Sequence, residues 1–210
     1  IPETIGSLVY LSRNLYHLKR HVVAGFNVSC VGDDRDYSYL PSKAGNTLSD
    51  KVVKHVLKNI YPGYSSYTWL DRGSDERQYC SPGVDLPIAS IMRTKYGEYP
   101  EYHTSLDDLE LVTPSGLLGG YWAVRRALEV LECNVIPKAT FLGEPQLGKH
   151  NLYPNVSIKT TSENAKEIFS ARTYLNILTY SDGKNTLIDI GDKIDMPVWE
   201  IQSHVKQLRD

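Results

Sequence analysis

The chain has 210 residues, of which 41% are hydrophobic, and its 23 Lys and Arg against 25 Asp and Glu give a net charge of −2. These values are typical of a soluble globular protein with one large domain, or a medium domain and a small one. The lack of basic excess argues against a nucleic-acid partner, and no apolar run approaches the roughly 18 residues that cross a bilayer.

The three cysteines, Cys30, Cys80 and Cys133, are widely spaced and form no CxxC pair. This pattern argues against a disulfide scaffold or a zinc ribbon, and favours a reducing, cytoplasmic location. The chain starts at Ile1 without a Met, and IPETIGSLVYL resembles the middle of a domain. We therefore expect an N-terminal portion of the protein to precede it.

Helices and strands alternate along the first two thirds of the chain. Apolar spacing predicts helices over 5–20 and 48–60, the second capped by Asn46-Thr47, and another helix that begins after Thr113 with Pro114 at its first position. Short β-rich runs predict strands at 26–32, 66–70 and 86–92. Such alternation favours an α/β sandwich with a largely parallel sheet, in which ligands bind beyond the carboxyl ends of the strands.

The amino-acid composition changes after Cys133. Residues 134–165 are rich in Pro, Gly, Asn and Lys and are typical of a linker, whereas 166–210 contain three short helical patterns. Their spacing suits a winged helix-turn-helix. Because 166–210 hold six Lys and Arg against seven Asp and Glu, we expect this module to pack against protein or itself rather than DNA.

Two loops follow the predicted strands. DRGSDERQYCSPGVD, residues 71–85, alternates acids and bases, which fits either a self-neutralising surface loop or a loop held against a pocket. KYGEYPEYHTSLDDLELV, residues 95–112, places His103 among tyrosines and carboxylates. A lone histidine is more often structural than a ligand, although a nearby Asp107 or Asp108 could orient its imidazole at a metal.

These stretches carry a family resemblance. IPETIGSLVYLS, together with RGSDERQYCSPGVDLPIASIMRTKYGEYPEYHTSLDDL, resembles a group of bacterial and archaeal aminopeptidase-like proteins that were long filed as a domain of unknown function and are often labelled polysaccharide biosynthesis proteins. They belong to the superfamily of zinc aminopeptidases and glutaminyl cyclases. The resemblance covers residues 1 to about 135, and the C-terminal tail also fits the group. It implies a three-layer α/β sandwich with a mostly parallel central sheet, followed by a small winged-helix-like domain.

The resemblance assigns roles residue by residue. Glu3, in the frame Glu3-Thr4-Ile5-Gly6, matches the general base, and His103 in Tyr-His-Thr matches a C-terminal metal ligand. Thr4 and Ser29 stand where the family has carboxylate ligands, so the resemblance implies one zinc ion rather than two. The remaining ligands, a His and an Asp, would lie upstream of Ile1.

The same resemblance makes residues 71–77 a substrate-pocket loop. It implies that Asp75 or Glu76 binds the amino group of a substrate, while Arg72 or Arg77 holds a carboxylate or the loop itself. Asp75 as a metal ligand is a weaker option. Asp107 or Asp108 would orient the imidazole of His103 without contacting the metal.

Two functions follow from these assignments. The first is a zinc-dependent aminopeptidase-like hydrolase of peptides or small amides, formed by residues 1–135, with a linker at 136–165 and a helix-turn-helix module at 166–210. The alternative is a non-catalytic regulatory or assembly module with a degenerate peptidase fold and a protein-binding tail. Loss of carboxylates at Thr4 and Ser29 favours the alternative; a His and an Asp at ligand spacing upstream would favour the enzyme.

Overall fold

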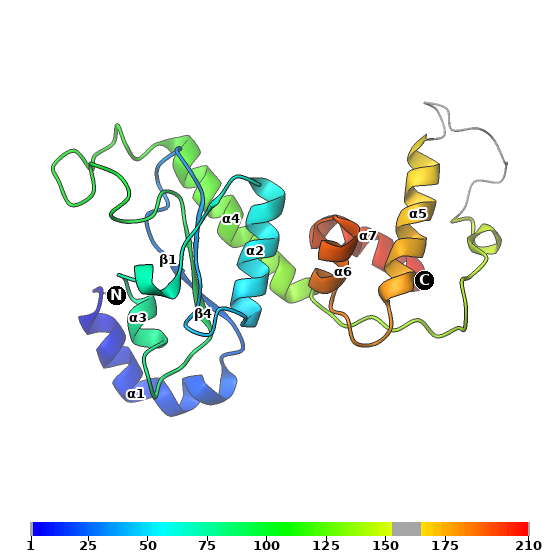
Figure 1. The fold of residues 1–210 in the computed structure, drawn as a ribbon, viewed down its shortest axis with the longest axis horizontal. Helices are drawn as coiled ribbons and strands as arrows, with labels where there is room; N and C mark the ends of the chain where they lie inside the picture. Colours follow the sequence, from blue (N-terminus) through cyan, green and yellow to red (C-terminus); the bar gives the residue numbers. More distant parts are fainter. Residues whose placement is uncertain (1, 153–164, 210) are drawn as a thin grey trace. The chain divides into compact units, whose positions relative to one another are not determined.

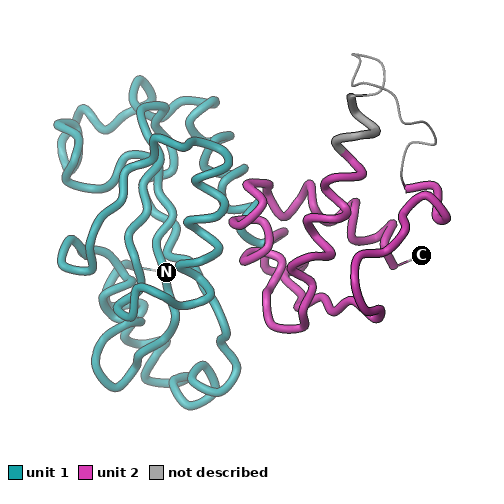
Figure 2. The backbone as a smooth tube through the Cα atoms, turned by 45° about the vertical axis from the view of Figure 1, so that its right-hand side comes forward, with its two compact units in different colours: residues 1–128 teal, residues 129–210 magenta. Residues whose placement is uncertain are grey.

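The structure, a computed structural model, describes residues 2–152 and 165–209. It divides into two compact units, residues 1–128 and 129–210, which are coloured separately in Figure 2. No helix in the described part of the chain is long and apolar enough to cross a membrane. Each unit is described by itself below.

The first unit is a mixed α/β fold (Figure 1). Its helices are α1 (Ile5–His21), α2 (Leu48–Ile60), the short α3 (Glu76–Tyr79) and α4 (Pro114–Cys133), whose last residues belong to the second unit. Its strands are β1 (Gly25–Val28), β2 (Ser38–Leu40), β3 (Ser65–Ser66) and β4 (Ile88–Met92). A 3-10 turn, η1, covers Trp69–Asp71.

The four strands form one sheet in the order β1-β4-β2-β3. β1 runs parallel to β4 and β2 runs parallel to β3, but β2 is antiparallel to β4. The sheet is therefore mixed, and a three-layer sandwich around a mostly parallel sheet stays a prediction. In Figure 1, β4 lies between α2 and α3, and both helices pack on it.

Local chemistry explains the helix boundaries that the sequence predicts. Thr47 caps α2 in a reciprocal box with Asp50, and the valine and leucine stripe of this helix is buried against the sheet. Asp50 is itself buried: burial alone would raise its pKa, but hydrogen bonds from Ser42, Thr47 and Tyr39 hold the pKa below its usual value.

The predicted strand at 66–70 is wrong. Only Ser65–Ser66 pair with β2, because the Thr68 hydroxyl accepts from Leu70 N while Asp71 reaches back to Thr68 N at 2.8 Å. This side-chain capping closes a 3-10 turn where the β-rich composition favours an extended chain.

The second unit contains α5 (Ala165–Tyr180), α6 (Leu187–Ile194) and α7 (Val198–Arg209), with a 3-10 turn, η2, at Leu147–His150. Asp195, in the left-handed conformation, ends α6, and α7 follows within three residues, which is helix-turn-helix geometry. The described part of the predicted linker is not detached. Lys138 forms a β-bridge with Asp182, and a pocket of about 540 Å³ opens between residues 135–141, α5 and α7.

Candidate active site

The site lies where β1 and β4 end, at the same edge of the sheet. Beyond β1, the backbone carbonyl of Cys30 accepts from Arg93 N at 2.8 Å. Three residues after Cys30, the buried carboxylate of Asp33 accepts hydrogen bonds from Thr94 N at 2.9 Å and from the Thr94 hydroxyl at 2.6 Å. These bonds hold the two chain segments that leave the parallel strands side by side.

Glu3 and Thr4 approach this edge from the start of the chain. The backbone N–H of Thr4 donates to Asp75 Oδ1 at 2.7 Å, and Arg77 Nη2 donates to the Thr4 hydroxyl at 2.9 Å. Asp75 immediately precedes α3, and Arg77 is part of it. Residues separated by more than seventy positions are thus brought together, with Glu3 exposed beside them.

Glu76 occupies a different environment from its neighbour Asp75. Its side chain is fully buried, and its carboxylate accepts hydrogen bonds from four donors. They are Gly73 N at 2.7 Å, Ser74 N at 2.9 Å, the Tyr96 hydroxyl at 2.9 Å and Asn27 Nδ2 at 2.9 Å. This carboxylate therefore joins the loop before α3 to β1 and to the segment after β4.

Glu76 in turn affects the pKa of the Tyr96 phenol. Burial raises the pKa of the Tyr96 phenol, and the charge of Glu76 and the hydrogen bond to it raise that pKa further. A Cβ at Gly73 would stand 2.7 Å from the Tyr96 ring, so only glycine allows the loop backbone to lie against this ring.

His103 lies on the loop that follows β4. Its φ is 59°, its side chain is exposed, and its ring stacks on Tyr102 with 3.9 Å between ring centroids. Burial raises the pKa of the Tyr102 phenol, and electrostatic interactions with Cys30 and Glu3 add to that rise. The Tyr99 hydroxyl, on the same loop, donates to Cys30 Sγ at 3.6 Å.

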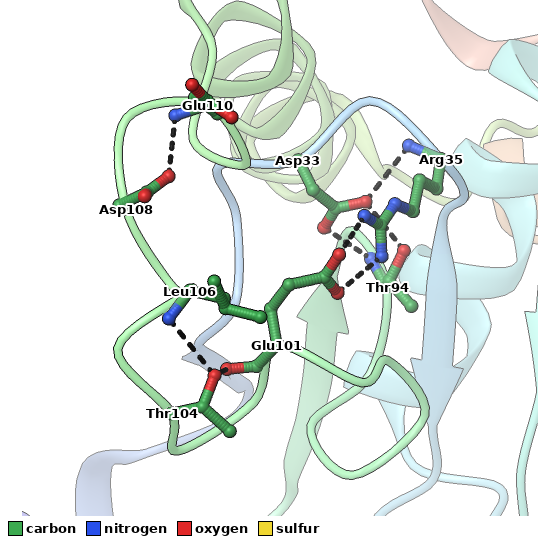
Figure 3. A network of polar contacts seen from close by, with 8 residues as sticks. All are labelled: Asp33, Arg35, Thr94, Glu101, Thr104, Leu106, Asp108 and Glu110. Carbon is green, nitrogen blue, oxygen red and sulfur yellow. Dashed lines mark hydrogen bonds and ion pairs between the residues drawn. The ribbon is translucent and has the colours of Figure 1, made fainter.

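An ion pair anchors this loop (Figure 3). Glu101 accepts two hydrogen bonds from the Arg35 guanidinium, at 2.6 and 2.9 Å, while Arg35 N donates to Asp33. The Glu101 carbonyl accepts from Thr104 N at 3.0 Å, which closes a tight turn around His103. The arrangement ties His103 to the segment that follows β1.

The remaining predicted residues make local contacts. Asp108 Oδ1 accepts from Glu110 N at 2.8 Å (Figure 3), and within residues 2–152 and 165–209 neither Asp107 nor Asp108 has a recorded hydrogen bond to His103. Arg72 donates to the Trp69 carbonyl at 3.2 Å, and its guanidinium lies 5.3 Å from the centre of the Trp69 ring.

The described residues do not form a metal site by themselves. Among residues 2–152 and 165–209, no three His, Cys, Asp or Glu side chains gather closely enough to hold an ion. Thr4 and Ser29, for which the resemblance implies carboxylate positions, have hydroxyls. The Thr4 hydroxyl accepts from Arg77, and the Ser29 hydroxyl lies 3.6 Å from Cys30 Sγ. Of the predicted ligands, this part of the chain supplies His103 alone.

Two family models cover the chain. Residues 1–134 match a domain of unknown function, DUF4910, and residues 135–210 match a winged helix-turn-helix. The chain belongs to the DUF4910 family. The winged helix-turn-helix predicted for the C-terminal part is confirmed, although the matched region begins well before residue 166.

Relatives of this DUF4910 chain carry peptidase names. A Clostridium acetobutylicum protein, "Putative polysaccharide biosynthesis protein with aminopeptidase-like domain", is 37% identical over 200 residues, which are 93% of this chain and 44% of the relative. A crystal structure described as a "putative peptidase" from Clostridium acetobutylicum has a TM-score of 0.84 and 34% identity, and covers 100% of this chain and 45% of its own.

A third likeness is weaker. The aminopeptidase from Aneurinibacillus sp. strain AM-1 has a TM-score of 0.49 and 18% identity, and covers 60% of this chain and 30% of its own, which is too low to bear on function. The first two relatives confirm the aminopeptidase-like resemblance. The DUF4910 chain spans less than half the length of each of them.

Sequence reasoning missed several residues that build this DUF4910 site. Tyr96 and Asn27, which hold Glu76, and Arg35, which holds Glu101, lie far from these partners in sequence, so sequence patterns did not indicate the contacts. Cys30 carried a usable signal, because it lies near the carboxyl end of the predicted strand at 26–32, and ligands bind beyond such strand ends.

Proposed function

We propose that this chain contributes part of the active site of a metal-dependent aminopeptidase-like hydrolase, which cleaves a peptide or small amide with water. The hydrogen bond from Thr4 N to Asp75, which holds Glu3 beside the predicted substrate loop, carries this proposal. The peptidase names of two relatives support the reaction class. A three-layer sandwich around this sheet belongs to the same proposal for the complete domain.

Glu3 would act as the general base. An exposed carboxylate beside the site can accept a proton from the attacking water and pass it to the leaving amine, so that amide and water become acid and amine. His103 would be one ligand of a single zinc ion, whose chemistry is to polarise the scissile carbonyl. Its exposed ring has no recorded hydrogen bond within the described residues, which leaves a nitrogen available.

The contacts distinguish Asp75 from Glu76 and Arg77 among the residues predicted to bind substrate. Glu76 is enclosed and Arg77 is bonded to Thr4, whereas Asp75 is only partly buried and uses a single carboxylate oxygen in its recorded contact. We assign the attraction of a substrate amino group to the charge of Asp75, with Arg72 at the edge of the loop. An acid left unpaired without an ammonium would favour substrates with a free amino terminus.

The test uses the complete protein, purified with its metal. Elemental analysis should find about one zinc per chain, by analogy with catalytic sites of three protein ligands. His103→Ala should lose this zinc, while His150→Ala, an exposed histidine of the second unit, should retain it. Retention of zinc by His103→Ala would disprove the ligand assignment.

Activity is measured on a panel of aminoacyl p-nitroanilides. Glu3→Gln should keep its zinc and lose about 10²- to 10⁴-fold in kcat, the range that general acid–base catalysis contributes. Undiminished turnover by this variant would exclude Glu3 as the base. Turnover of N-acetylated substrates as fast as of free amines would exclude an aminopeptidase.

A non-catalytic regulatory or assembly role is the second candidate. The hydroxyls of Thr4 and Ser29 favour it, because they replace carboxylates at positions where the resemblance implies metal ligands. This function predicts a complete protein without bound zinc and without turnover, and a winged helix-turn-helix that binds protein or its own second copy. Zinc analysis and the p-nitroanilide panel therefore separate the two functions.

A further inference from the structure

The backbone at Thr4 has an unusual conformation. Its φ and ψ are 62° and −66°, and the N–H of Ile5 donates to the carbonyl of Glu3 at 2.7 Å. These values describe a γ-turn of the rare, strained kind, with Thr4 at its centre. A β-branched residue rarely adopts this region, and such strain persists only where surrounding groups enforce it.

Two side chains from one short segment enforce the turn. Asp75 Oδ1 accepts from Thr4 N at 2.7 Å, and Arg77 Nη2 donates to Thr4 Oγ1 at 2.9 Å. One bond fixes the backbone of Thr4 and the other fixes its side chain. Together they oppose rotation of the residue that follows Glu3.

The segment that makes these bonds is itself fixed. Glu76 lies between Asp75 and Arg77 in sequence, and its buried carboxylate accepts from Gly73, Ser74, Tyr96 and Asn27. The grip on Thr4 is therefore supported by β1 and by the segment after β4, and not by a free loop.

We propose that Asp75 and Arg77 are positioning residues, which hold the strained turn at Thr4 and so fix the backbone that carries Glu3. This role rests on the proposed function, in which Glu3 is the general base. The proposal gives Asp75 two separate roles. One carboxylate oxygen holds Thr4, and the charge of the carboxylate attracts the substrate amino group.

Asparagine and alanine at position 75 separate these duties in the complete protein. Asp75→Asn keeps an acceptor oxygen for Thr4 N but removes the charge, whereas Asp75→Ala removes both. With an aminoacyl p-nitroanilide, Asp75→Asn should raise KM and leave kcat within about 3-fold, while Asp75→Ala should lower kcat by about 100-fold, the size expected from misplacing a catalytic group. An equal loss of kcat in the two variants would overturn the proposal.

Hydrogen exchange followed by mass spectrometry gives a readout that does not need turnover. Peptides covering residues 2–8 should exchange faster in Asp75→Ala than in the wild type, and Asp75→Asn should match the wild type. Unchanged exchange in Asp75→Ala would overturn the hold on Thr4. If Glu3→Gln keeps full activity, the positioning role falls with the proposed base, while exchange still decides whether Asp75 holds the turn.

The Arg77 contact is tested through the Thr4 hydroxyl. Thr4→Ser retains the acceptor and should keep kcat, whereas Thr4→Val retains the shape without the acceptor and should lose activity like Arg77→Gln. Because Thr4→Val and Arg77→Gln remove the same hydrogen bond, the double variant should lose no more activity than either single variant. Additive losses would show that Arg77 acts elsewhere.

Discussion

The guanidinium of Arg35 and the carboxylate of Glu101 meet in a two-bond ion pair, at 2.6 and 2.9 Å, sixty-six positions apart in sequence. This pair fastens the loop of His103 to the segment after β1 (Figure 3). Hydrogen bonds from Arg35, with its charge, lower the pKa of Glu101 to about 2. The loop that would carry a metal ligand therefore has its own electrostatic anchor.

The anchor predicts a pH dependence. A carboxyl whose folded pKa is depressed adds stability that is fully present above its unfolded pKa and is lost as pH falls through the folded value. The pair should hold down to about pH 2, and an NMR titration should find the pKa of the Glu101 carboxyl well below its usual value of 4.5. Arg35→Gln should return that pKa toward 4.5, while Arg13→Gln, an exposed arginine on α1, should not.

Glu76 should stabilise the fold. In Glu76→Gln an amide NH₂ would face groups that are themselves donors, so we expect a loss of about 1–3 kcal/mol in the free energy of unfolding. Thermal denaturation should show a Tm lower by roughly 2–4 °C for each kcal/mol. Glu110→Gln, at an exposed position, is the matched control and should leave Tm unchanged. Equal Tm values for the two variants would contradict the burial of Glu76.

Gly73 should not accept a side chain. The new Cβ in Gly73→Ala would lie 2.7 Å from the Tyr96 ring, and shifting that ring would disturb the bond from Tyr96 to Glu76. We expect about 1–3 kcal/mol of destabilisation from this overpacking, measured by urea denaturation. Gly63→Ala, whose Cβ would meet nothing closer than 3.8 Å, should change stability by less than about 1 kcal/mol.

The winged helix-turn-helix should bind DNA weakly. Residues 166–210 carry six Lys and Arg against seven Asp and Glu, and the first turn of α7 carries Glu200 where a recognition helix approaches bases. Fluorescence anisotropy on duplex DNA should give a Kd no tighter than the roughly 10⁻⁴–10⁻⁶ M of non-specific binding, with a shallow salt dependence. A nanomolar, steeply salt-dependent Kd would reverse this prediction.

The sequence predicts the longer helices well because their signals are local. The stripe and cap of α2 lie within fifteen residues, and Pro114 marks the start of α4 as predicted. It does not predict β2 or α3. β2 has three residues and is buried throughout, so it shows no alternation, and α3 is a single turn inside a charged loop.

The candidate site is predictable only in part. Glu3 and His103 stand in recognisable motifs, but their proposed roles are still to be tested. The separation of Asp75 from Glu76 could not be foreseen, since adjacent acids in a charged loop look alike in sequence. Only the partners Asn27 and Tyr96, distant in the chain, make Glu76 a buried structural carboxylate.

The bonds that hold the site's edge together involve residues that are not proposed to react. Asp33 joins the segments that follow β1 and β4 through Thr94, and Glu76 joins α3 to β1 and to the segment after β4. Neither Thr4 nor Ser29 takes part in these bonds, so a substitution at either position leaves the bonds in place. The bonds that shape this edge are therefore separate from the residues proposed to react, so the activity of the chain has to be measured and does not follow from the fold.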